Sequence, residues 1–198
     1  MPTDGVNTKR RRFLVATTSV VGAVGAGFAA VPFIKSWKPS ARAKAVGAPV
    51  QVPLDGLEPG QILKVQWRGQ TLGELRRSED TLGLLPEVAD DLSDPDSLES
   101  EQPEYAQYAS RAIRDEYLVV NRHCTHLGCI PQLMPQVKAQ PFEENWKGGF
   151  YCPCHKSKCD MAGRVYKGVP APANLKIPPY SFIDDSTLVI GVNPEGAV

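Results

Sequence analysis

The sequence predicts a mostly β domain of antiparallel sheets, preceded by one N-terminal transmembrane helix. Three observations support this fold class. Residues 13–34 contain no charged side chain. From Val50 onward, short apolar segments alternate with turns, in keeping with the 18 Pro and 17 Gly of the chain. All five Cys and all three His fall between His123 and Cys159, which indicates a metal site or a disulfide framework in that domain.

Residues 1–12 are interpreted as a cytoplasmic twin-arginine export segment. The basic residues 9–12 stand directly before Phe13-Leu14 and an apolar run, which is a stronger pattern than twin arginine alone. A generic basic flank that obeys the positive-inside rule is the alternative. Export of a folded chain by this route suits a cofactor assembled in the cytoplasm, and the oxidising destination permits a disulfide.

Residues 13–34 are expected to form an uncleaved transmembrane helix. As an α-helix this run spans roughly 33 Å, against about 30 Å of hydrocarbon. Trp37 and Lys38 follow at the position expected for the membrane interface. A cleaved signal is the competing interpretation, because residues 41–43 (Ala-Arg-Ala) make a small-x-small site. We expect a single-pass protein of a bacterial inner membrane, with residues 35–198 in the periplasm.

Residues 35–49 are expected to form a flexible hinge linker. They are rich in Ala, with Ala41, Ala43 and Ala45, and have almost no bulky apolar group to bury. As a coil the segment spans roughly 20 Å on average. A passive spacer is the alternative.

Residues 50–198 are expected to fold as one periplasmic domain. Apolar runs and alternation predict strands at residues 61–68, 71–77, 117–120 and 188–192, and the apolar pair 150–151 leads into the second cysteine group. The polar, acidic stretch 93–110 is expected to form a short helix or an irregular excursion. Two prolines make residues 168–173 a rigid loop. The 22 basic and 22 acidic side chains balance, so the chain has no global basic field to hold nucleic acid.

Two short motifs carry the candidate chemistry, residues 124–129 (CTHLGC) and residues 152–157 (CPCHKS). Each supplies one unit in which a His follows a Cys by two or three positions, and one further Cys. Two thiolates and two imidazoles can hold either a tetrahedral zinc ion or a Rieske [2Fe–2S] cluster. A zinc site leaves Cys129 and Cys154 without a role, and a Cys–His nucleophile leaves still more of these residues unused. The favoured site is therefore one [2Fe–2S] Rieske cluster, and its candidate ligands are Cys124, His126, Cys152 and His155.

The paired motifs resemble the signature of the Rieske iron–sulfur subunit of proteobacterial cytochrome bc1 complexes (quinol–cytochrome c reductases). The twin-arginine anchor, the linker and the segment GRVYKGVPAPANL are similar as well, so the resemblance covers nearly the whole chain. It implies a Rieske-type antiparallel β-sandwich with a cluster-binding subdomain. It also implies an electron-transfer subunit that takes an electron from quinol and passes it to cytochrome c1. Cytochrome b and cytochrome c1 are the implied partners, in a dimeric complex.

The same resemblance assigns roles to the cluster ligands. It implies that the thiolates of Cys124 and Cys152 hold the buried iron. It implies that the imidazoles of His126 and His155 hold the exposed iron. His155 is the histidine implied to contact the quinol and to take its proton.

Further roles follow from the resemblance for residues around the ligands. It implies a disulfide between Cys129 and Cys154, and a proline loop at 168–173 that covers the cluster. Ser157 is similar in position to the family serine that donates a hydrogen bond to a bridging sulfide.

Three places depart from the family pattern. Lys156 stands where the family usually has Gly, and residues 121–123 (Asn-Arg-His) stand where apolar or small residues are usual. Cys159 occupies the position of a tyrosine that donates to a ligand sulfur, and a thiol is a weaker donor than a phenol. A lower cluster potential than in a Tyr-bearing relative is therefore expected.

Two other Rieske classes are alternatives. The small subunit of an arsenite-oxidase-type enzyme shares export, disulfide and cluster, but does not need a retained membrane helix. The Rieske domain of a ring-hydroxylating oxygenase is disfavoured by the additional cysteine pair and the export signal.

Overall fold

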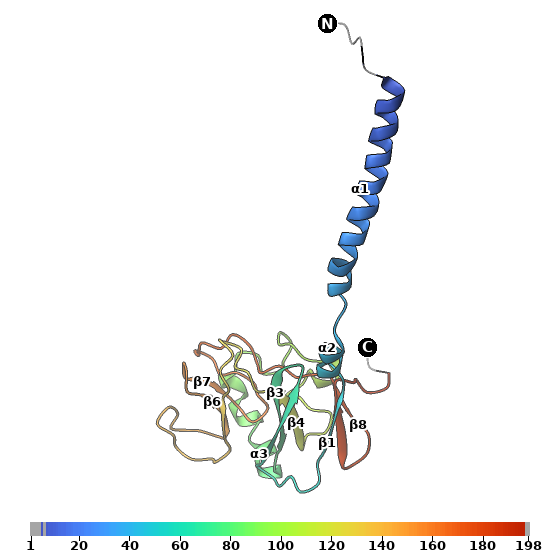
Figure 1. The fold of residues 1–198 in the computed structure, drawn as a ribbon. Coiled ribbons are helices and arrows are strands. Elements are labelled where there is room, and N and C mark those ends of the chain that lie inside the picture. The colour runs from blue at the N-terminus through green and yellow to red at the C-terminus, as the bar shows by residue number, and fades with distance from the viewer. Residues whose placement is uncertain (1–4, 6, 197–198) are drawn as a thin grey trace. The chain divides into compact units, whose positions relative to one another are not determined.

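The computed structural model describes residue 5 and residues 7–196, which form two compact units that meet between Ala45 and Val46 (Figure 1). Residues 1–4 and 6 of the expected cytoplasmic segment 1–12 lie outside the described part of the chain, as do residues 197–198.

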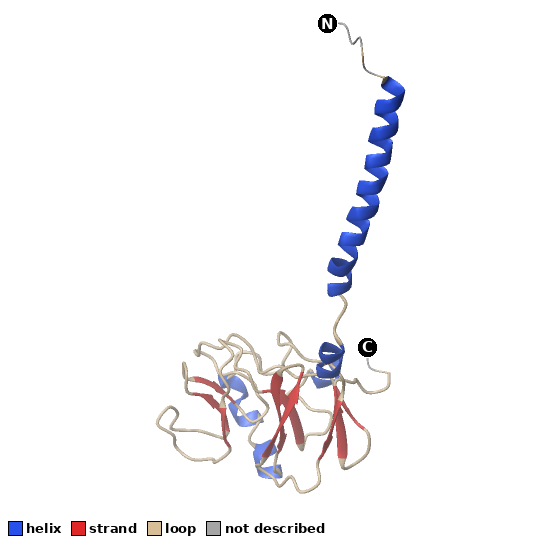
Figure 2. Ribbon diagram, in the orientation of Figure 1, coloured by secondary structure: helices blue, strands red, loops and turns tan. Residues whose placement is uncertain are grey.

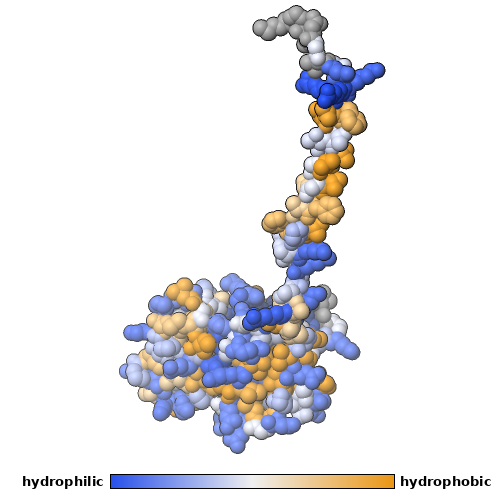
Figure 3. Space-filling view, in the orientation of Figure 1, coloured by the Kyte–Doolittle hydropathy of each residue, from blue (hydrophilic) through white to orange (hydrophobic). Residues whose placement is uncertain are grey.

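The N-terminal unit is dominated by helix α1 (Thr8–Ser36). Asn7 caps the helix by accepting a hydrogen bond from the Arg10 backbone N–H at 3.1 Å, so the arginines lie inside its first turns. None of its described residues is buried, and its apolar middle is flanked by charged ends (Figure 3). The helix is long and apolar enough to cross a membrane, and it extends beyond the expected span 13–34 at both ends.

The segment expected as coil, residues 35–49, is more ordered than its composition indicated. Helix α1 continues to Ser36, and a second helix, α2 (Ala41–Val46), follows, with Ser40 accepting from the Ala43 backbone N–H. The reason is that Ala has the highest helix propensity and Ser is a good N-cap. Whether the segment acts as a hinge is a separate prediction, and a six-residue helix is marginal without packing.

Residues 46–48 belong to the second unit. The backbone N–H of Arg68 donates to the carbonyl of Val46, and the Trp67 indole N–H donates to the carbonyl of Ala48 at 3.1 Å. The second unit therefore begins at Val46, four residues before the boundary expected at Val50.

In its described residues the second unit contains three antiparallel sheets of three strands each, ordered β1-β9-β8, β2-β3-β4 and β5-β6-β7 (Figure 2). The strands are β1 (Val50–Pro53), β2 (Ile62–Trp67), β3 (Gln70–Arg76), β4 (Tyr117–Asn121), β5 (Gln132–Met134), β6 (Gly149–Cys152), β7 (Ser157–Cys159), β8 (Tyr180–Phe182) and β9 (Thr187–Ile190). The short helices are α3 (Glu79–Gly83), η1 (Pro86–Asp91) and η2 (Glu104–Ala106).

The strands predicted from apolar pattern are present as β2, β3, β4 and β9. The five that were not predicted, β1, β5, β6, β7 and β8, have only three or four residues each. Such segments are too short to show a period, and they exist because a neighbouring strand completes their hydrogen bonds. The stretch 93–110 contains the 3₁₀ helix η2 within turns, as a short helix or excursion would.

Two of the sheets pack face to face. Tyr117 on β4 contacts Phe182 on β8 edge to face at 6.1 Å, and Gly191 after β9 lies against the Trp67 ring of β2, where an added Cβ would come within 3.0 Å. These contacts define which face of the β2-β3-β4 sheet is internal, because side chains alternate along a strand.

Glu74 on β3 lies on that internal face. It pairs with Leu63 on β2 and Val119 on β4, shares the side of Trp67 and Tyr117, and is 1% exposed. Neither carboxyl oxygen has a hydrogen-bond partner among the described residues. Burial raises the pKa of Glu74 to about 8, so the group is neutral in the folded protein at pH 7.

Candidate metal centre

Both ligand motifs form tight loops, and an equivalent backbone hydrogen bond closes each of them. In the loop after β4, the Gly128 N–H donates to the Cys124 carbonyl at 2.9 Å. In the loop between β6 and β7, the Lys156 N–H donates to the Cys152 carbonyl, also at 2.9 Å. The second loop is a hairpin, because Cys152 ends β6 and pairs with Ser157 at the start of β7. Each loop therefore presents its Cys at the base and its His near the tip.

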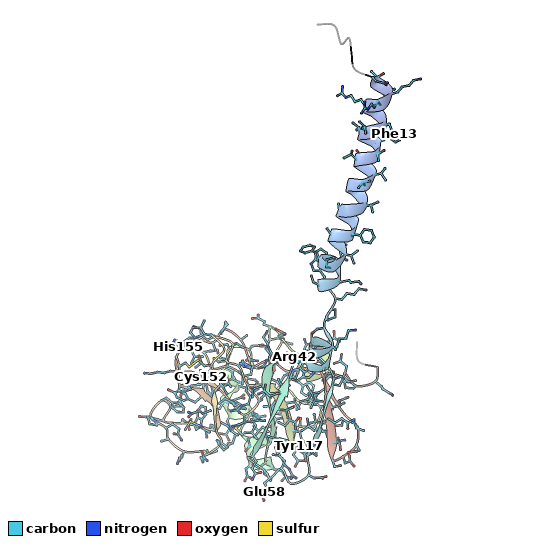
Figure 4. All side chains as sticks on the ribbon, viewed as in Figure 1. Phe13, Arg42, Glu58, Tyr117, Cys152 and His155 are labelled. Carbon is cyan, nitrogen blue, oxygen red and sulfur yellow. A yellow bond between two sulfur atoms is a disulfide. The ribbon has the colours of Figure 1, made fainter. Side chains whose placement is uncertain are left out.

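The two loops are joined by a disulfide between Cys129 and Cys154, the pair that the resemblance implies. The Sγ atoms of these two residues and of Cys152 lie within 4.8 Å of one another. Because the disulfide sulfurs cannot act as thiolate ligands, only Cys152 of that group remains to bind a metal. Cys152 and His155 lie beside each other at the β6–β7 end of the domain (Figure 4).

The histidine rings of the two loops lie close together, edge to face. The ring centroids of His126 and His155 are 4.7 Å apart and their planes are nearly perpendicular, at 84°. Nδ1 of His126 is buried and has no hydrogen-bond partner among the described residues, whereas His155 is exposed. A buried imidazole nitrogen without a partner costs free energy unless another atom binds it, and a metal ion is such an atom.

The free thiols of the two ligand motifs are more deeply buried than the histidines. Cys124 is 5% exposed and Cys152 is 2% exposed, and neither takes part in a disulfide. Burial raises the pKa of the Cys124 thiol, while hydrogen bonds from the His126 backbone and from Ser157 oppose that rise. A buried thiol of this kind becomes a thiolate when a metal replaces its proton. The donor set of two buried thiols and two neighbouring imidazoles therefore fits a [2Fe–2S] cluster with mixed ligands.

The proline loop contacts both ligand loops. The Thr125 hydroxyl donates to the Ala173 carbonyl at 2.7 Å, and the Ala171 backbone N–H donates to the Ser157 hydroxyl oxygen at 3.1 Å. Ser157 is buried, and its side chain opposes the rise of the Cys124 pKa. The loop at 168–173 is therefore hydrogen-bonded to both ligand loops and fixes their positions relative to each other.

Asn174 anchors the proline loop and was not recognised from the sequence. Its side-chain oxygen accepts from the Val165 N–H at 2.7 Å, and its amide donates to the Asp94 carbonyl and to the Ser97 hydroxyl, each at 2.9 Å. Its backbone N–H donates to the Ser100 hydroxyl oxygen. Three of these partners, Asp94, Ser97 and Ser100, come from the acidic stretch 93–110, so no local motif could have indicated them.

The departures from the family pattern take different places in the site. His123 is half-buried, and its Nδ1 pairs with the Asn121 side chain at 2.8 Å rather than with a ligand loop. Lys156 is exposed beside His155, and Leu127 is 70% exposed on the first loop. Cys159 is buried on β7, where burial strongly raises the pKa of its thiol.

Comparison with known proteins places this geometry in a family. Residues 1–40 match the family model for the ubiquitinol-cytochrome c reductase Fe–S subunit TAT signal, and residues 89–179 match the Rieske [2Fe–2S] domain. A ubiquinol-cytochrome c reductase iron–sulfur subunit from Allochromatium vinosum is 50% identical over 191 residues, which cover 96% of this chain and 92% of that protein. The chain belongs to the ubiquinol-cytochrome c reductase iron–sulfur subunit family.

A second member of the ubiquinol-cytochrome c reductase iron–sulfur subunit family, from Rhodospirillum rubrum, is 40% identical over 192 residues, covering 96% of this chain and 95% of that protein. A chain from a hyperthermophilic respiratory complex III superposes with a TM-score of 0.49 at 25% identity, covering 89% of this chain and 98% of that chain.

Membership of this family confirms the Rieske fold and its [2Fe–2S] cluster as expected from the motifs. The zinc interpretation is not supported, because the two extra cysteines pair with each other and the matched domain is an iron–sulfur domain. The arsenite-oxidase alternative is not supported either, because the matched relatives are reductase subunits. The export-signal match and α1 also support a membrane-anchored subunit that faces the periplasm.

Proposed function

We propose that this chain is the electron-transfer subunit of a quinol–cytochrome c reductase, which takes an electron from quinol and passes it to cytochrome c1. One observation carries the proposal: the buried Nδ1 of His126, which has no partner in the described part of the chain, lies in a loop disulfide-linked to the loop that presents His155. Relatives over nearly the full length carry the reductase-subunit name, which supports the same assignment.

Four residues are proposed to hold the cluster, namely Cys124, His126, Cys152 and His155. The buried thiols suit the inner iron, and the imidazoles suit the iron nearer the surface. When bound, the cluster accepts and releases one electron at a time. The surrounding chain excludes water from the thiol side, since Cys124 and Cys152 are almost fully buried beneath the proline loop.

His155 is proposed as the residue that meets the quinol. Its ring is exposed at the tip of the β6–β7 hairpin, so a quinol hydroxyl can approach its free ring nitrogen and transfer a proton to it. Leu127 on the neighbouring loop presents an exposed apolar side chain that suits the quinol and its protein pocket. Proton and electron can therefore leave the quinol at one place.

The anchor and the linker suit a carrier that moves between two partners. We infer that α1 crosses the bacterial inner membrane once, remains uncleaved and keeps the domain in the periplasm. Cytochrome b and cytochrome c1 are the proposed partners, in a dimeric complex. The segment between α1 and Val46 packs no residue into the domain core, which supports a hinge there.

Purification of the tagged protein from its native membrane tests the proposed function. Detergent extracts are expected to contain the full-length chain together with b-type and c-type haem proteins. The reduced complex is expected to give the EPR spectrum of a mixed-ligand [2Fe–2S] cluster, and quinol should reduce both cluster and c-type haem. Isolation of the chain without haem partners, or with a mature N-terminus near Ala43, would contradict the proposal.

Cys159 provides a test of how the chain adjusts the cluster potential. Cys159→Ser keeps the size of the side chain and replaces a weak thiol donor with a stronger hydroxyl donor. If the side chain points to a ligand sulfur, the midpoint should rise by about 40 mV, the one-electron equivalent of about 1 kcal/mol. Ser157→Ala should lower the midpoint by a similar amount, because it removes the hydroxyl group that favours the charged form of the Cys124 thiol.

Potentiometric titration followed by EPR measures both midpoints. Cys159→Ala serves as the control for packing and should leave the midpoint near wild type. Equal midpoints for Cys159→Ser and Cys159→Ala would show that position 159 only fills space in the core.

A further inference from the structure

The two ligand loops share a left-handed backbone position, and only one of them fills it with glycine. The residue four places after the ligand cysteine donates the closing hydrogen bond in each loop. It is Gly128 with φ 80° in the first loop and Lys156 with φ 63° in the second. Glycine adopts this region freely, whereas a residue with a Cβ is strained there. The strain of a lysine at position 156 must therefore be offset by a favourable interaction of its side chain.

No contact within the described part of the chain compensates for the backbone strain at Lys156, in contrast to the other residues with positive φ. Four described non-glycine residues have positive φ, namely Arg68, Ser97, Arg111 and Lys156. The side chains of the first three are held: Arg68 stacks on Trp67 at 4.4 Å, Ser97 accepts from Asn174, and Arg111 donates to the carbonyls of residues 162, 163 and 175. The ammonium group of Lys156 makes no hydrogen bond, ion pair or cation–π contact with any described residue.

Of the two lysines beside the tip of the β6–β7 hairpin, Lys156 has no counter-charge among the described residues. Lys158 is paired with Glu143 at 2.6 Å, and Lys147 is paired with Glu87 at 2.9 Å. Lys156 and Lys158 border a hollow of about 310 Å³ whose floor contains Phe142 stacked on Tyr151 at 3.8 Å. The tip of the β6–β7 hairpin thus offers a free positive charge at the edge of an aromatic surface.

We propose that Lys156 is an electrostatic docking residue that pairs with a carboxylate on the electron-accepting cytochrome c1. The inference rests on the proposed function, because it names a contact of the same site. The acceptor is favoured over the quinol-binding partner, because an ammonium group enclosed beside neutral quinol would lose its water without gaining a counter-charge. At a hydrated interface between proteins, a complementary charge pair speeds docking and orients it. Lys156 therefore acts in electron delivery and not in quinol oxidation.

Three substitutions separate charge from backbone strain. Lys156→Gln removes the charge and keeps a long side chain, Lys156→Gly removes both charge and strain, and Lys156→Arg keeps the charge. Lys138→Gln is the matched control, since Lys138 is also exposed and has no ion pair among the described residues, but lies outside the ligand loops. Each variant is studied in the purified complex, mixed rapidly with a short-chain ubiquinol.

The rate of c1 haem reduction at low salt should fall about two- to fivefold in Lys156→Gln and Lys156→Gly, the range expected for one exposed charge pair. The salt dependence of that rate should flatten. Lys156→Arg and Lys138→Gln should match wild type, and cluster reduction by quinol should be unchanged in all four. Lys156→Gly should also raise the unfolding temperature by about 2–4 °C, because the strain is gone, so its slower rate cannot come from misfolding.

The possible outcomes are distinguishable. A wild-type rate and salt dependence in Lys156→Gln would overturn the Lys156 proposal alone. A loss confined to quinol-driven cluster reduction would assign Lys156 to the quinol-binding partner and overturn the choice of acceptor. Absence of quinol-dependent haem reduction in the wild-type complex would overturn the proposed function as well.

Discussion

Replacing His126 with alanine is expected to yield a folded chain that no longer holds the [2Fe–2S] cluster. The buried Nδ1 of His126 has no protein partner among the described residues, so it is the atom left available to an iron. Removing it opens one of the four proposed ligand positions, and the neighbouring Leu127 side chain cannot replace it. The Cys129–Cys154 disulfide and the packed sheets remain, so the fold should survive.

Visible absorption, iron content and the EPR spectrum of the reduced protein measure this effect, with circular dichroism as the check on folding. His123→Ala is the matched control, because His123 lies three positions upstream and pairs with Asn121. It should retain the cluster. Cys152→Ser should lose the cluster, whereas Cys159→Ser should keep it. A full cluster in His126→Ala would exclude that residue as a ligand.

The domain is expected to lose stability as the pH rises from about 5 to about 8, because of Glu74. In the unfolded chain this carboxyl ionises at its ordinary pKa of 4.5, while burial in the folded domain raises the pKa to about 8. Between these values the folded state binds one more proton than the unfolded state, so rising pH favours unfolding. The contribution of Glu74 to the free energy of unfolding is therefore fully present below the pKa of 4.5 and is lost as the pH rises through the pKa of about 8.

The size of the effect is bounded by the difference between the two pKa values, which corresponds to about 5 kcal/mol at most. Glu74→Met keeps a similar length without an ionisable group and should remove this part of the pH dependence. It should also raise stability at pH 8, where wild type must bury an unpaired carboxylate between two sheets.

Denaturant unfolding of the full-length chain in detergent, repeated between pH 5 and pH 9, measures the free energy of unfolding. Glu144→Met is the control, since Glu144 is exposed on a loop and should leave the pH profile parallel to wild type. If Glu74→Met also runs parallel to wild type, the carboxyl is ionised and solvated in the folded domain.

Much of the site was predictable because its information is local. The candidate ligands lie within two motifs of six residues, and thiol and imidazole chemistry limits what such motifs can bind. The anchor was predictable for a similar reason, because hydropathy adds up along a continuous run of residues. In both cases neighbouring residues in the sequence act together, whatever the rest of the chain does.

The support of the site was not predictable, because it depends on contacts between distant segments. Asn174 joins the proline loop to Asp94 and Ser97, about eighty residues upstream, and no spacing rule connects them. The strand β7 exists because β6 lies beside it, since three residues carry no recognisable period. The helix α2 differs from the expected coil for another reason: the Ala-rich run has few bulky apolar groups, but Ala favours helix and Ser40 caps the segment.

The sequence by itself determined the donor atoms, the anchor and the class of cofactor, because side-chain chemistry and hydropathy belong to residues one at a time. Only the tertiary structure decided how those atoms are used. Within the described residues, packing left Nδ1 of His126 without a partner, placed Glu74 between two sheets, and bent Lys156 into a left-handed turn with its charge unpaired. Burial, pairing and strain are relations between residues, so they arise only when the chain has folded.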